Sequence, residues 1–383
     1  QANIFLERAK PIIDEGGPNA DRLTEVQVEV YKANVRFMRA AYYFYLMELY
    51  GPVPLVTQSL TLQDELDLPR NTLDEVINFI DAELLEAMTG MAQEPYHTDY
   101  ANFGAVPTKG TALALRAKLW TYAASKLYNG GFVEALTLTN NDGTRLFPDY
   151  DANKLQKAAD ACKDFIEYAE GNGGRYELYK NPGAFSPELS VYEVFQEYNR
   201  EIIWATTKNQ WGALGDQNFV SMVTPRSENK GLGGIHVLQE LVDEFYMADG
   251  LPIKATSFLP KSPDYDASES GFGTLTGTFG GFEVSNMYIG REPRFYNTIT
   301  FSGKKWQVSD KEVQFYYGGN ADKTVPDGAP VTGYLLYKRH NRTIHGVVNT
   351  VTSKFHPSII FRLADFYLLY AETLNEVEPG NPD

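Results

Sequence analysis

Apolar residues recur at helical spacing through most of the first half of the chain, and this pattern limits the fold more than any other feature. Between Thr24 and Tyr50 there is no glycine or proline, and alanine and aromatic residues return at steps of three and four residues. Such steps place side chains on one face of an α-helix. Gly51 and Pro52 then end the segment, because neither residue favours a continuing helix. We therefore predict a long amphipathic helix over 24–50.

Three further segments of the first half have the same period. One starts at Asn71 or Thr72, a capping residue followed by acids in the first turn. Another opens at Pro107 and Thr108, and the last covers 153–170. Small residues share the apolar faces, so neighbouring helices can pack closely. Helix pairs of this kind are typical of tetratricopeptide-like solenoids, although the spacing of these segments is irregular.

The middle of the chain has a different composition. Over 181–357 helical period is rare, and glycine, proline, asparagine and serine separate short β-prone runs. Helical period returns over 358–377. The local predictions for the middle are a short helix over 236–247, a long loop over 271–281, and β-prone runs at 296–301 and 313–317.

No linker or block of charge divides the 383 residues, so we expect a single domain over 1–383. Its predicted fold class is all-α, with tetratricopeptide-like helix pairs over 24–180. A large loop-rich insertion with a few short strands follows over 181–357, and a helix returns over 358–377. Loops held by a helical body are common places for binding surfaces, so we expect the ligand to bind the loop-rich part.

The charge balance excludes one class of partner. The chain has 34 Lys and Arg against 50 Asp and Glu, a formal net charge of −16. A field of that sign repels phosphates, so we predict no nucleic-acid partner. No apolar run reaches the ~18 residues expected of a membrane-spanning helix. The single cysteine, Cys162, excludes an internal disulfide, and its position on an apolar helix stripe predicts a buried thiol.

Signatures of catalysis and of metal binding are missing. The sequence has no phosphate-binding glycine loop, no GxSxG nucleophile turn and no HExxH motif. The spacing of His340 and His345 fits neither a helix face nor a common metal site. Acidic turns at 140–143 and 264–266 resemble pieces of calcium loops without the closing glutamate. We predict no catalytic residue, no cofactor and no metal.

Aromatic residues are the unusual part of the composition, at 13% of the chain. Trp120, on a helix stripe, and Trp204, in a hydrophobic run, are expected in the core. In loops, a flat ring can stack on the apolar face of a sugar while short polar groups bind its hydroxyls. The alternative is that such rings anchor long loops. The predicted ligand-binding residues are Tyr96, Asp99 and Tyr100 before the third helix, then Asn209, Gln210 and Trp211, and finally Trp306, with Trp211 as the best single candidate.

Several short segments follow one another in a fixed order along nearly the whole chain. NVRFMRAAYYF at 34–44 leads into the turn LYGPVPLV at 49–56, and PTKGTALAL stands at 107–115. EIIW at 201–204, LVDEF at 241–245, REPRFY at 291–296 and RLADFYLLYAETLNE at 362–376 follow. Each segment is short, but the ordered set resembles the SusD/RagB family of bacterial outer-membrane nutrient-binding lipoproteins.

The resemblance implies an all-α scaffold of helix pairs with a loop-rich ligand-binding face. It implies a cell-surface protein, lipid-anchored in the outer membrane, that captures a glycan and delivers it to a SusC-like TonB-dependent transporter. Arg36 and Arg39 look architectural, and we expect them to pair with acids on neighbouring helices. Ligand residues of this family lie in variable loops, so no motif assigns them here. We expect the family's signal peptide, lipidated cysteine and C-terminal region to lie outside these residues.

From the sequence we predict a glycan-binding protein without catalytic activity. Three alternatives stay open. The first is a binder of peptides or glycopeptides within the same family. The second is a protein-interaction scaffold, because helix-pair solenoids commonly bind proteins. The third is a glycoside hydrolase, since a pair of catalytic carboxylates is defined in space and cannot be recognised in sequence.

Overall fold

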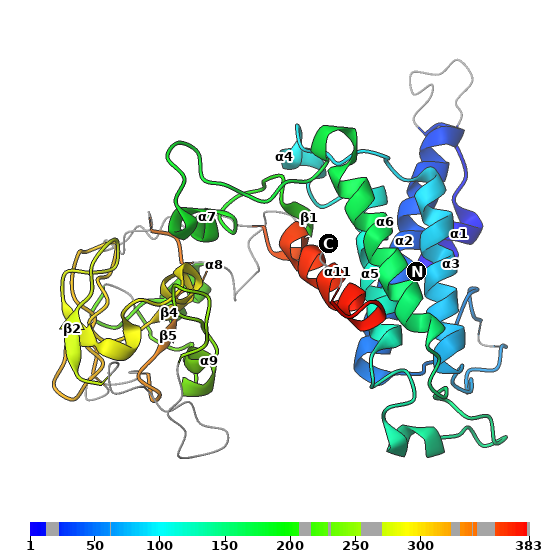
Figure 1. The fold of residues 1–383 in the computed structure, drawn as a ribbon. Helices are drawn as coiled ribbons and strands as arrows, with labels where there is room; N and C mark the ends of the chain where they lie inside the picture. The colour runs from blue at the N-terminus through cyan, green and yellow to red at the C-terminus, as the bar shows by residue number, and fades with distance from the viewer. Residues whose placement is uncertain are drawn as a thin grey trace. The chain divides into compact units, whose positions relative to one another are not determined.

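The chain divides into two compact units, seen here in a computed structural model. Unit 1 consists of 1–178, 199–206 and 359–383, and unit 2 consists of 179–198 and 207–358. Unit 1 contains the long helices, and unit 2 contains mostly loops with short elements (Figure 1). The structure describes residues 1–12, 23–61, 63–206, 216–228, 231–253, 270–322, 330–338, 340–342 and 357–380.

The helices of unit 1 pack in series. Helix α2 packs on α3, α3 on α5, α5 on α6, and α6 on α11. This is the tetratricopeptide-like arrangement predicted from the sequence, and the all-α fold class is confirmed. In chain order the elements are α1 (Ala2–Arg8), α2 (Glu25–Tyr50), α3 (Leu73–Gly90), α4 (Tyr100–Phe103), α5 (Lys109–Ala124), η1 (Val133–Thr137), α6 (Asn153–Gly174), β1 (Ile202–Ala205), β6 (Ile359–Arg362) and α11 (Leu363–Val377).

Capping side chains set where the long helices begin. Thr24 accepts a hydrogen bond from the Gln27 N–H, and its own N–H donates to the Gln27 side chain at 2.8 Å. Thr72 and Glu75 form the same reciprocal pair at the start of α3. These capping boxes satisfy N–H groups that a first helical turn leaves unpaired. The predicted helix starts at these threonines are confirmed.

Small residues bring the helices of unit 1 together, and large rings fill the space between them. Trp120 is 3% exposed, and its indole N–H donates to Asp81 Oδ1 at 3.0 Å. The Trp204 ring meets Phe37 edge-on, with centroids 5.2 Å apart. Cys162 is buried. The predicted core positions of both tryptophans and of the cysteine are confirmed.

One buried acid joins α2 to α3. Glu83 is 7% exposed and accepts a hydrogen bond from Arg39 Nε at 2.7 Å. Arg36 Nη1 lies 3.3 Å from the other carboxylate oxygen. Two cations on one carboxylate offset much of the cost of burying its charge. The predicted pairing of Arg36 and Arg39 with an acid on a neighbouring helix is confirmed.

The returning helix starts later than predicted. The prediction placed helix over 358–377, but 359–362 forms strand β6, which pairs antiparallel with β1. The Leu363 N–H donates to the Glu201 carbonyl at 2.9 Å, and α11 begins only there. The partner strand lies far away in sequence, and the β-branched Ile359 and Ile360 suit extended backbone.

Unit 2 has short elements only. Strand β2 pairs with β3, and β4 pairs with β5, both antiparallel. These pairs confirm the few short strands expected in the loop-rich part. The elements are α7 (Pro187–Glu193), α8 (Asp216–Val223), α9 (Gln239–Asp243), β2 (Phe272–Thr274), β3 (Glu283–Ser285), η4 (Asn286–Tyr288), α10 (Pro293–Thr298), β4 (Ile299–Thr300) and β5 (Leu335–Leu336).

Several local predictions in unit 2 are wrong. The predicted loop 271–281 contains β2, and the predicted helix 236–247 is helical only in α9. The β-prone run 296–301 is confirmed only in part: 299–300 forms β4, but 296–298 belong to α10, because Pro293 in the first turn favours a helix start. The run 313–317 forms no strand in the described structure. Val313 exchanges backbone bonds with Gly303 and Lys304, but the Gln314 and Phe315 N–H groups donate to the side chains of Asn320 and Ser302.

The core of unit 2 is built from aromatic rings. The rings of Tyr288 and Phe301 lie 4.4 Å apart, and the Trp306 ring meets Tyr337 edge-on at 5.5 Å. Lys304 is fully buried, with its Nζ 3.7 Å from the centroid of the Tyr337 ring and 2.7 Å from the carbonyls of Tyr296 and Ile299. Burial lowers the pKa of Lys304 well below its usual value.

Candidate functional site

The predicted ligand residues fall into three groups in the structure. Tyr96, Asp99 and Tyr100 lie together in unit 1, directly before α5. Asn209, Gln210 and Trp211 lie outside the described residues, so their role stays a prediction. Trp306 lies in the core of unit 2.

The prediction for Trp306 needs correction. Its ring is 1% exposed, and the imidazole of His340 lies 4.5 Å from it. The backbone N–H of Trp306 donates to the Lys311 carbonyl at 2.8 Å, and this bond closes a turn next to the ring. A ring enclosed in this way offers no face to a sugar. Trp306 is therefore a core residue. The prediction relied on the polar and glycine residues before it in the sequence, and these do not indicate exposure here.

Two stacked rings before α5 form the candidate ligand site. The rings of Tyr96 and Phe103 lie 4.9 Å apart and are inclined by 25°. Phe103 is 42% exposed, and Tyr96 is partly exposed. We call this pair the aromatic platform. The site prediction omitted Phe103, which ends the short helix α4, because its role depends on the Tyr96 ring stacked against it.

Polar groups stand beside the platform. The Asn102 amide donates to both carboxylate oxygens of Asp99, at 3.0 and 3.1 Å. No described residue donates to the Asn102 amide oxygen. The exposed Asn102 therefore has an acceptor available, and Asp99 has further lone pairs. The structure thus places the predicted Asp99 next to the predicted Tyr96.

Tyr100 anchors the segment that carries the platform. Its hydroxyl donates to the Asn199 carbonyl at 2.8 Å. His97 Nδ1 also contacts this hydroxyl, while His97 Nε2 donates to the Arg175 carbonyl. The Tyr176 ring packs edge-on against the imidazole, with centroids 5.5 Å apart. Because its hydroxyl is used inside unit 1, Tyr100 supports the site.

An ion pair holds the same segment from the other end. Arg175 donates to both carboxylate oxygens of Glu94 at 2.8 Å, and its guanidinium lies 4.4 Å over the Tyr168 ring. The hydrogen bond from Arg175 lowers the pKa of Glu94. Burial lowers the pKa of His97. The platform thus stands on a base that is ordered before any ligand arrives.

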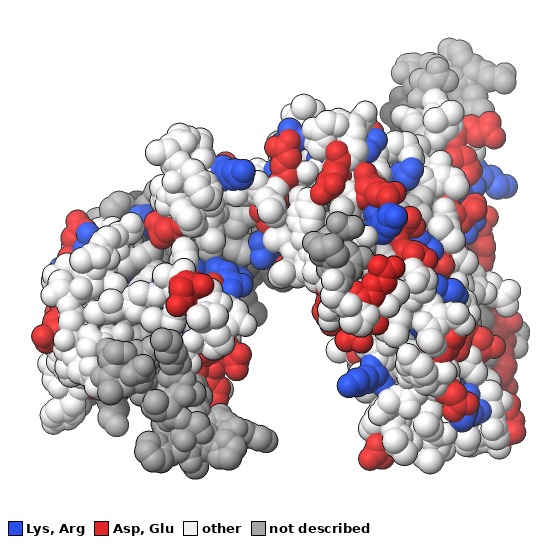
Figure 2. Space-filling model, viewed as in Figure 1, with Lys and Arg blue, Asp and Glu red and all other residues white. Residues whose placement is uncertain are grey.

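Charge is spread unevenly over the visible surface. Figure 2 shows acidic and basic side chains crowded on the visible face of unit 1, while broad areas of unit 2 on this face carry no charge. Near the platform, Glu94 and Asp99 are acidic and Arg175 is already paired. An uncharged ligand meets no repulsion at such a site, whereas an anionic ligand does.

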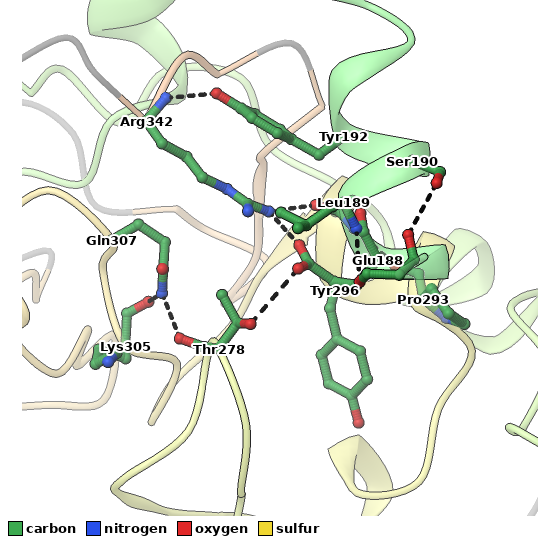
Figure 3. Close-up of polar contacts among 12 residues, drawn as sticks. Glu188, Leu189, Ser190, Tyr192, Thr278, Pro293, Tyr296, Lys305, Gln307 and Arg342 are labelled. Atoms are coloured by element: carbon green, nitrogen blue, oxygen red, sulfur yellow. Dashed lines mark hydrogen bonds and ion pairs between the residues drawn. The ribbon is translucent and has the colours of Figure 1, made fainter. Parts of the chain in front are cut away.

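Unit 2 contains a polar network around Arg342 and Glu188 (Figure 3). Arg342 lies 3.9 Å over the Tyr192 ring and contacts the Glu188 carboxylate. The same guanidinium donates to Asn297 Oδ1 at 2.6 Å, and the Asn297 amide donates to the Glu188 carbonyl at 3.0 Å. These bonds connect α7 to α10 and to the 340–342 segment. We therefore assign the network a structural role.

The described residues offer stacking and hydrogen bonding. Within the described ranges, no three His, Cys, Asp or Glu side chains come together as metal ligands would. Among the described helices, none has the length and apolar character needed to cross a bilayer.

Two family models match this sequence. The model described as "SusD family" matches 200–382, and the model described as "Starch-binding associating with outer membrane" matches 1–120. The chain belongs to the SusD/RagB family, and the resemblance seen in the ordered segments is confirmed. A search among curated proteins found no match.

Solved structures share the fold. A SusD-like protein from Bacteroides fragilis is 23% identical over 93% of this chain and 59% of its own, with a TM-score of 0.65. A SusD-like carbohydrate-binding protein from the same species is 18% identical over 98% of this chain and 58% of its own, with a TM-score of 0.60. A laminarin-binding SusD-like protein is 20% identical over 98% of this chain and 64% of its own, with a TM-score of 0.52. The chain therefore spans about 60% of the length of these relatives.

Proposed function

We propose that this protein binds a glycan at the bacterial cell surface, without turning it over, and delivers it to a SusC-like TonB-dependent transporter. The observation that carries the proposal is the aromatic platform on a SusD-family fold. The family description that refers to starch binding at the outer membrane supports it. So do the solved relatives described as carbohydrate-binding and laminarin-binding.

In this proposal a sugar ring lies against the exposed faces of Tyr96 and Phe103. The rings bind the apolar C–H face of the sugar, while Asn102 and Asp99 take its hydroxyls. A neutral glycan fits best, because Glu94 and Asp99 place negative charge beside the rings. The ordered base reduces the entropy lost on binding.

Replacing Tyr96 tests the platform. Stacking is worth roughly 1–2 kcal/mol by analogy with aromatic pairs, so Tyr96→Ala should weaken binding about tenfold. Tyr150→Ala is the matched control, because Tyr150 is a 63% exposed tyrosine of unit 1 outside the platform. Calorimetric titration with oligosaccharides from laminarin, starch and xyloglucan measures both variants. Parent-like affinity of Tyr96→Ala would reject the platform as the site.

Binding without turnover follows from the state of the nearby acids. Arg175 keeps Glu94 ionised, so Glu94 is a poor general acid at neutral pH. The Asp99 carboxylate accepts two hydrogen bonds from the Asn102 amide. Incubation with the same glycans should release no reducing ends. Steady release from one defined glycan would overturn this part of the proposal in favour of a glycoside hydrolase.

Delivery requires a contact surface, and we assign it to the outer face of α2. Residues at steps of three and four share one side of a helix. Here that side carries large apolar side chains that are 37–72% exposed. An exposed apolar patch of this kind typically marks a macromolecular interface. Its members are Tyr42, Tyr45, Leu46, Leu49 and Tyr50.

A charged substitution on this face tests the transporter contact. Leu49→Glu should abolish co-purification with the TonB-dependent transporter encoded beside this gene, while glycan affinity stays unchanged. Leu368→Glu, at a 69% exposed leucine of α11, is the control. Equal co-purification of both variants with the transporter would move the contact elsewhere. A gene neighbourhood without a transporter would contradict the delivery step itself.

We further propose a lipid anchor in the outer membrane. A single acyl chain holds a protein only weakly, so stable anchoring needs more than one chain, as bacterial lipoproteins have. The full gene should encode a signal peptide that ends at a cysteine upstream of Gln1. Replacing that cysteine should release the protein from the membrane fraction. A precursor with a cytoplasmic start would remove both the surface location and the transporter partner.

A further inference from the structure

A loop of unit 2 holds two tyrosines in the solvent. Tyr316 is 54% exposed and Tyr317 is 85% exposed. Within the part of the chain that the structure describes, neither ring contacts another ring and neither hydroxyl makes a hydrogen bond. Single exposed apolar residues are ordinary, but two adjacent exposed rings on one loop are a common feature of binding surfaces.

Side-chain hydrogen bonds hold this loop in one conformation. The Gln314 N–H donates to Asn320 Oδ1 at 3.0 Å, and the Asn320 amide donates to the Glu312 carbonyl at 2.8 Å. The carboxylate of Asp322, a residue that is 2% exposed, accepts a hydrogen bond from the Gly318 N–H at 2.7 Å. These bonds all lie within 312–322, so they fix the conformation of the turn itself.

Two glycines make the turn possible. Gly318 has a φ of +79°, in the region that only glycine enters easily. A Cβ on Gly319 would lie 2.6 Å from the Gln314 carbonyl oxygen, so a larger residue does not fit. The Gly319 N–H closes the turn on the Tyr316 carbonyl at 2.9 Å. The tyrosine rings are thus presented by a preformed turn, and a ligand does not need to order it.

We infer that Tyr316 and Tyr317 form a second carbohydrate-binding site, which takes a neutral polysaccharide chain. The inference rests on the proposed glycan-binding function for the class of ligand, but it uses none of the platform residues. A tyrosine ring has an apolar face for the C–H side of a sugar and a hydroxyl for its polar edge.

The charges around the loop select an uncharged ligand. Glu312 and the buried Asp322 are the charged groups that tie the turn, and both are acidic. The net charge of the chain, −16, has the same sign. Anionic polysaccharides and phosphates are therefore disfavoured at this loop. The α2 outer face differs, because it mixes leucines with tyrosines along a helix and so suits a protein partner.

The test is affinity electrophoresis of the whole 383-residue chain in native gels that contain a neutral polysaccharide. The probes are laminarin, xyloglucan, soluble starch, galactomannan and arabinogalactan. The double variant Tyr316→Ala/Tyr317→Ala should raise the Kd for the retarding polysaccharide about tenfold or more. Phe272→Ala, at a 72% exposed ring of the same unit, should bind like the parent. Thermal melts should coincide, because neither tyrosine fills a cavity.

A second readout follows the rings directly. Tetranitromethane nitrates exposed tyrosines, and the retarding polysaccharide should protect Tyr317 but not the exposed Tyr150. Mass spectrometry of the peptides measures both positions in one sample. Equal nitration of Tyr317 with and without every polysaccharide of the panel would overturn the inference. Protection by a tryptic peptide mixture, and by no polysaccharide, would also overturn it and identify a protein-binding loop.

Tyr96→Ala, measured in the same gels, separates this inference from the platform proposal. Weaker binding of Tyr96→Ala alone would reject the second site and keep the platform. Weaker binding of the double variant alone would support the second site and reject the platform. Weaker binding of both supports two sites. Parent-like retardation of both variants would reject both sites.

Discussion

The core of unit 1 combines many buried alanines with aromatic rings, whereas the core of unit 2 consists mainly of aromatic rings. In unit 1, Ala112, Ala114 and Ala117 of α5 are buried and allow neighbouring helices to approach closely. In unit 2, residues such as Phe295 and Phe301 pack ring against ring, at 5.2 Å between centroids. The backbone N–H and C=O groups of the long helices in unit 1 are hydrogen-bonded within each helix, so packing of small side chains is enough to hold the helices together. The loops of unit 2 lack this internal bonding, and side chains such as those around Arg342 hold them.

The candidate binding rings lie in different places from the rings of the two cores. The long helices of unit 1 bury several rings in the core, among them Phe37, Phe44 and Trp120. The candidate binding rings stand on turns in both units, where local side-chain bonds fix them. Tyr96 lies in the segment that the Tyr100 hydrogen bond holds, and Tyr317 lies in the turn that the Asn320 and Asp322 hydrogen bonds hold. The positions of the candidate binding rings are therefore set by local hydrogen bonds in their own segments.

The largest expected effect tests whether the two cores are equally sensitive. Trp120→Ala in unit 1 and Trp306→Ala in unit 2 should each lower the free energy of unfolding by roughly 3–5 kcal/mol, because each leaves a cavity. Chemical denaturation followed by circular dichroism measures both, with Tyr150→Ala as the exposed control. Should Trp306→Ala melt like the parent and lose glycan affinity, the core assignment of Trp306 would be wrong.

The next effect concerns the charged contact between α2 and α3. Glu83→Gln leaves Arg36 and Arg39 without a carboxylate and should cost roughly 3 kcal/mol of stability, since an unpaired buried charge is expensive. Glu86→Gln, at an exposed acid of the same helix, should change stability little. Urea unfolding of both variants checks this. Equal midpoints would mean that alanine packing alone holds these helices.

A smaller effect concerns the residue that the sequence marks as the best ligand contact. Trp211 lies outside the described residues, and we still expect Trp211→Ala to weaken glycan binding about tenfold, with little change in stability. Calorimetric titration next to Tyr96→Ala compares a contact from each unit. If Trp211→Ala binds like the parent, or melts far below it, the residue is a loop anchor.

The smallest effect is a pH dependence in unit 1. Burial lowers the pKa of His97 below its usual 6.5, so the unfolded chain binds a proton more readily than the folded chain. The free energy of unfolding should therefore fall as the pH drops through the usual value, and stay level above it. His97→Gln should flatten this slope relative to the parent in urea titrations at several pH values. An unchanged slope would show that other groups, such as Glu94 with its lowered pKa, set the pH dependence.

Local signals allowed much of unit 1 to be predicted. Thr24 and Thr72 are capping residues at the start of periodic stretches, and both features lie within a few residues of one another. Arg36 and Arg39 stood out as charges on an apolar helix. The strand at 359–362 was missed, because its partner is remote in sequence. The propensity of a few residues cannot reveal such a partner.

The candidate site was harder to predict, because a ring on a loop has two possible uses. Trp306 and Tyr96 look alike in sequence, with polar neighbours, yet one ring is enclosed and the other is partly exposed. Phe103 gains its role only from stacking on Tyr96. Tyr316 and Tyr317 looked like part of a strand, because the Asn320 bonds that form the turn depend on spacing that no propensity scale includes.

The pairing of β1 with β6 also dictates an order of events during synthesis. Arg362 and Glu201, whose side chains meet at 2.7 Å, are separated by 161 residues of sequence. The helices from α2 to α6 can assemble as soon as they have been synthesised, since their contacts are local. The edge of β1 must wait, unpaired, until the whole of unit 2 has been made. A nascent or prematurely terminated chain therefore carries an open strand edge, which is a template for aggregation until it is covered.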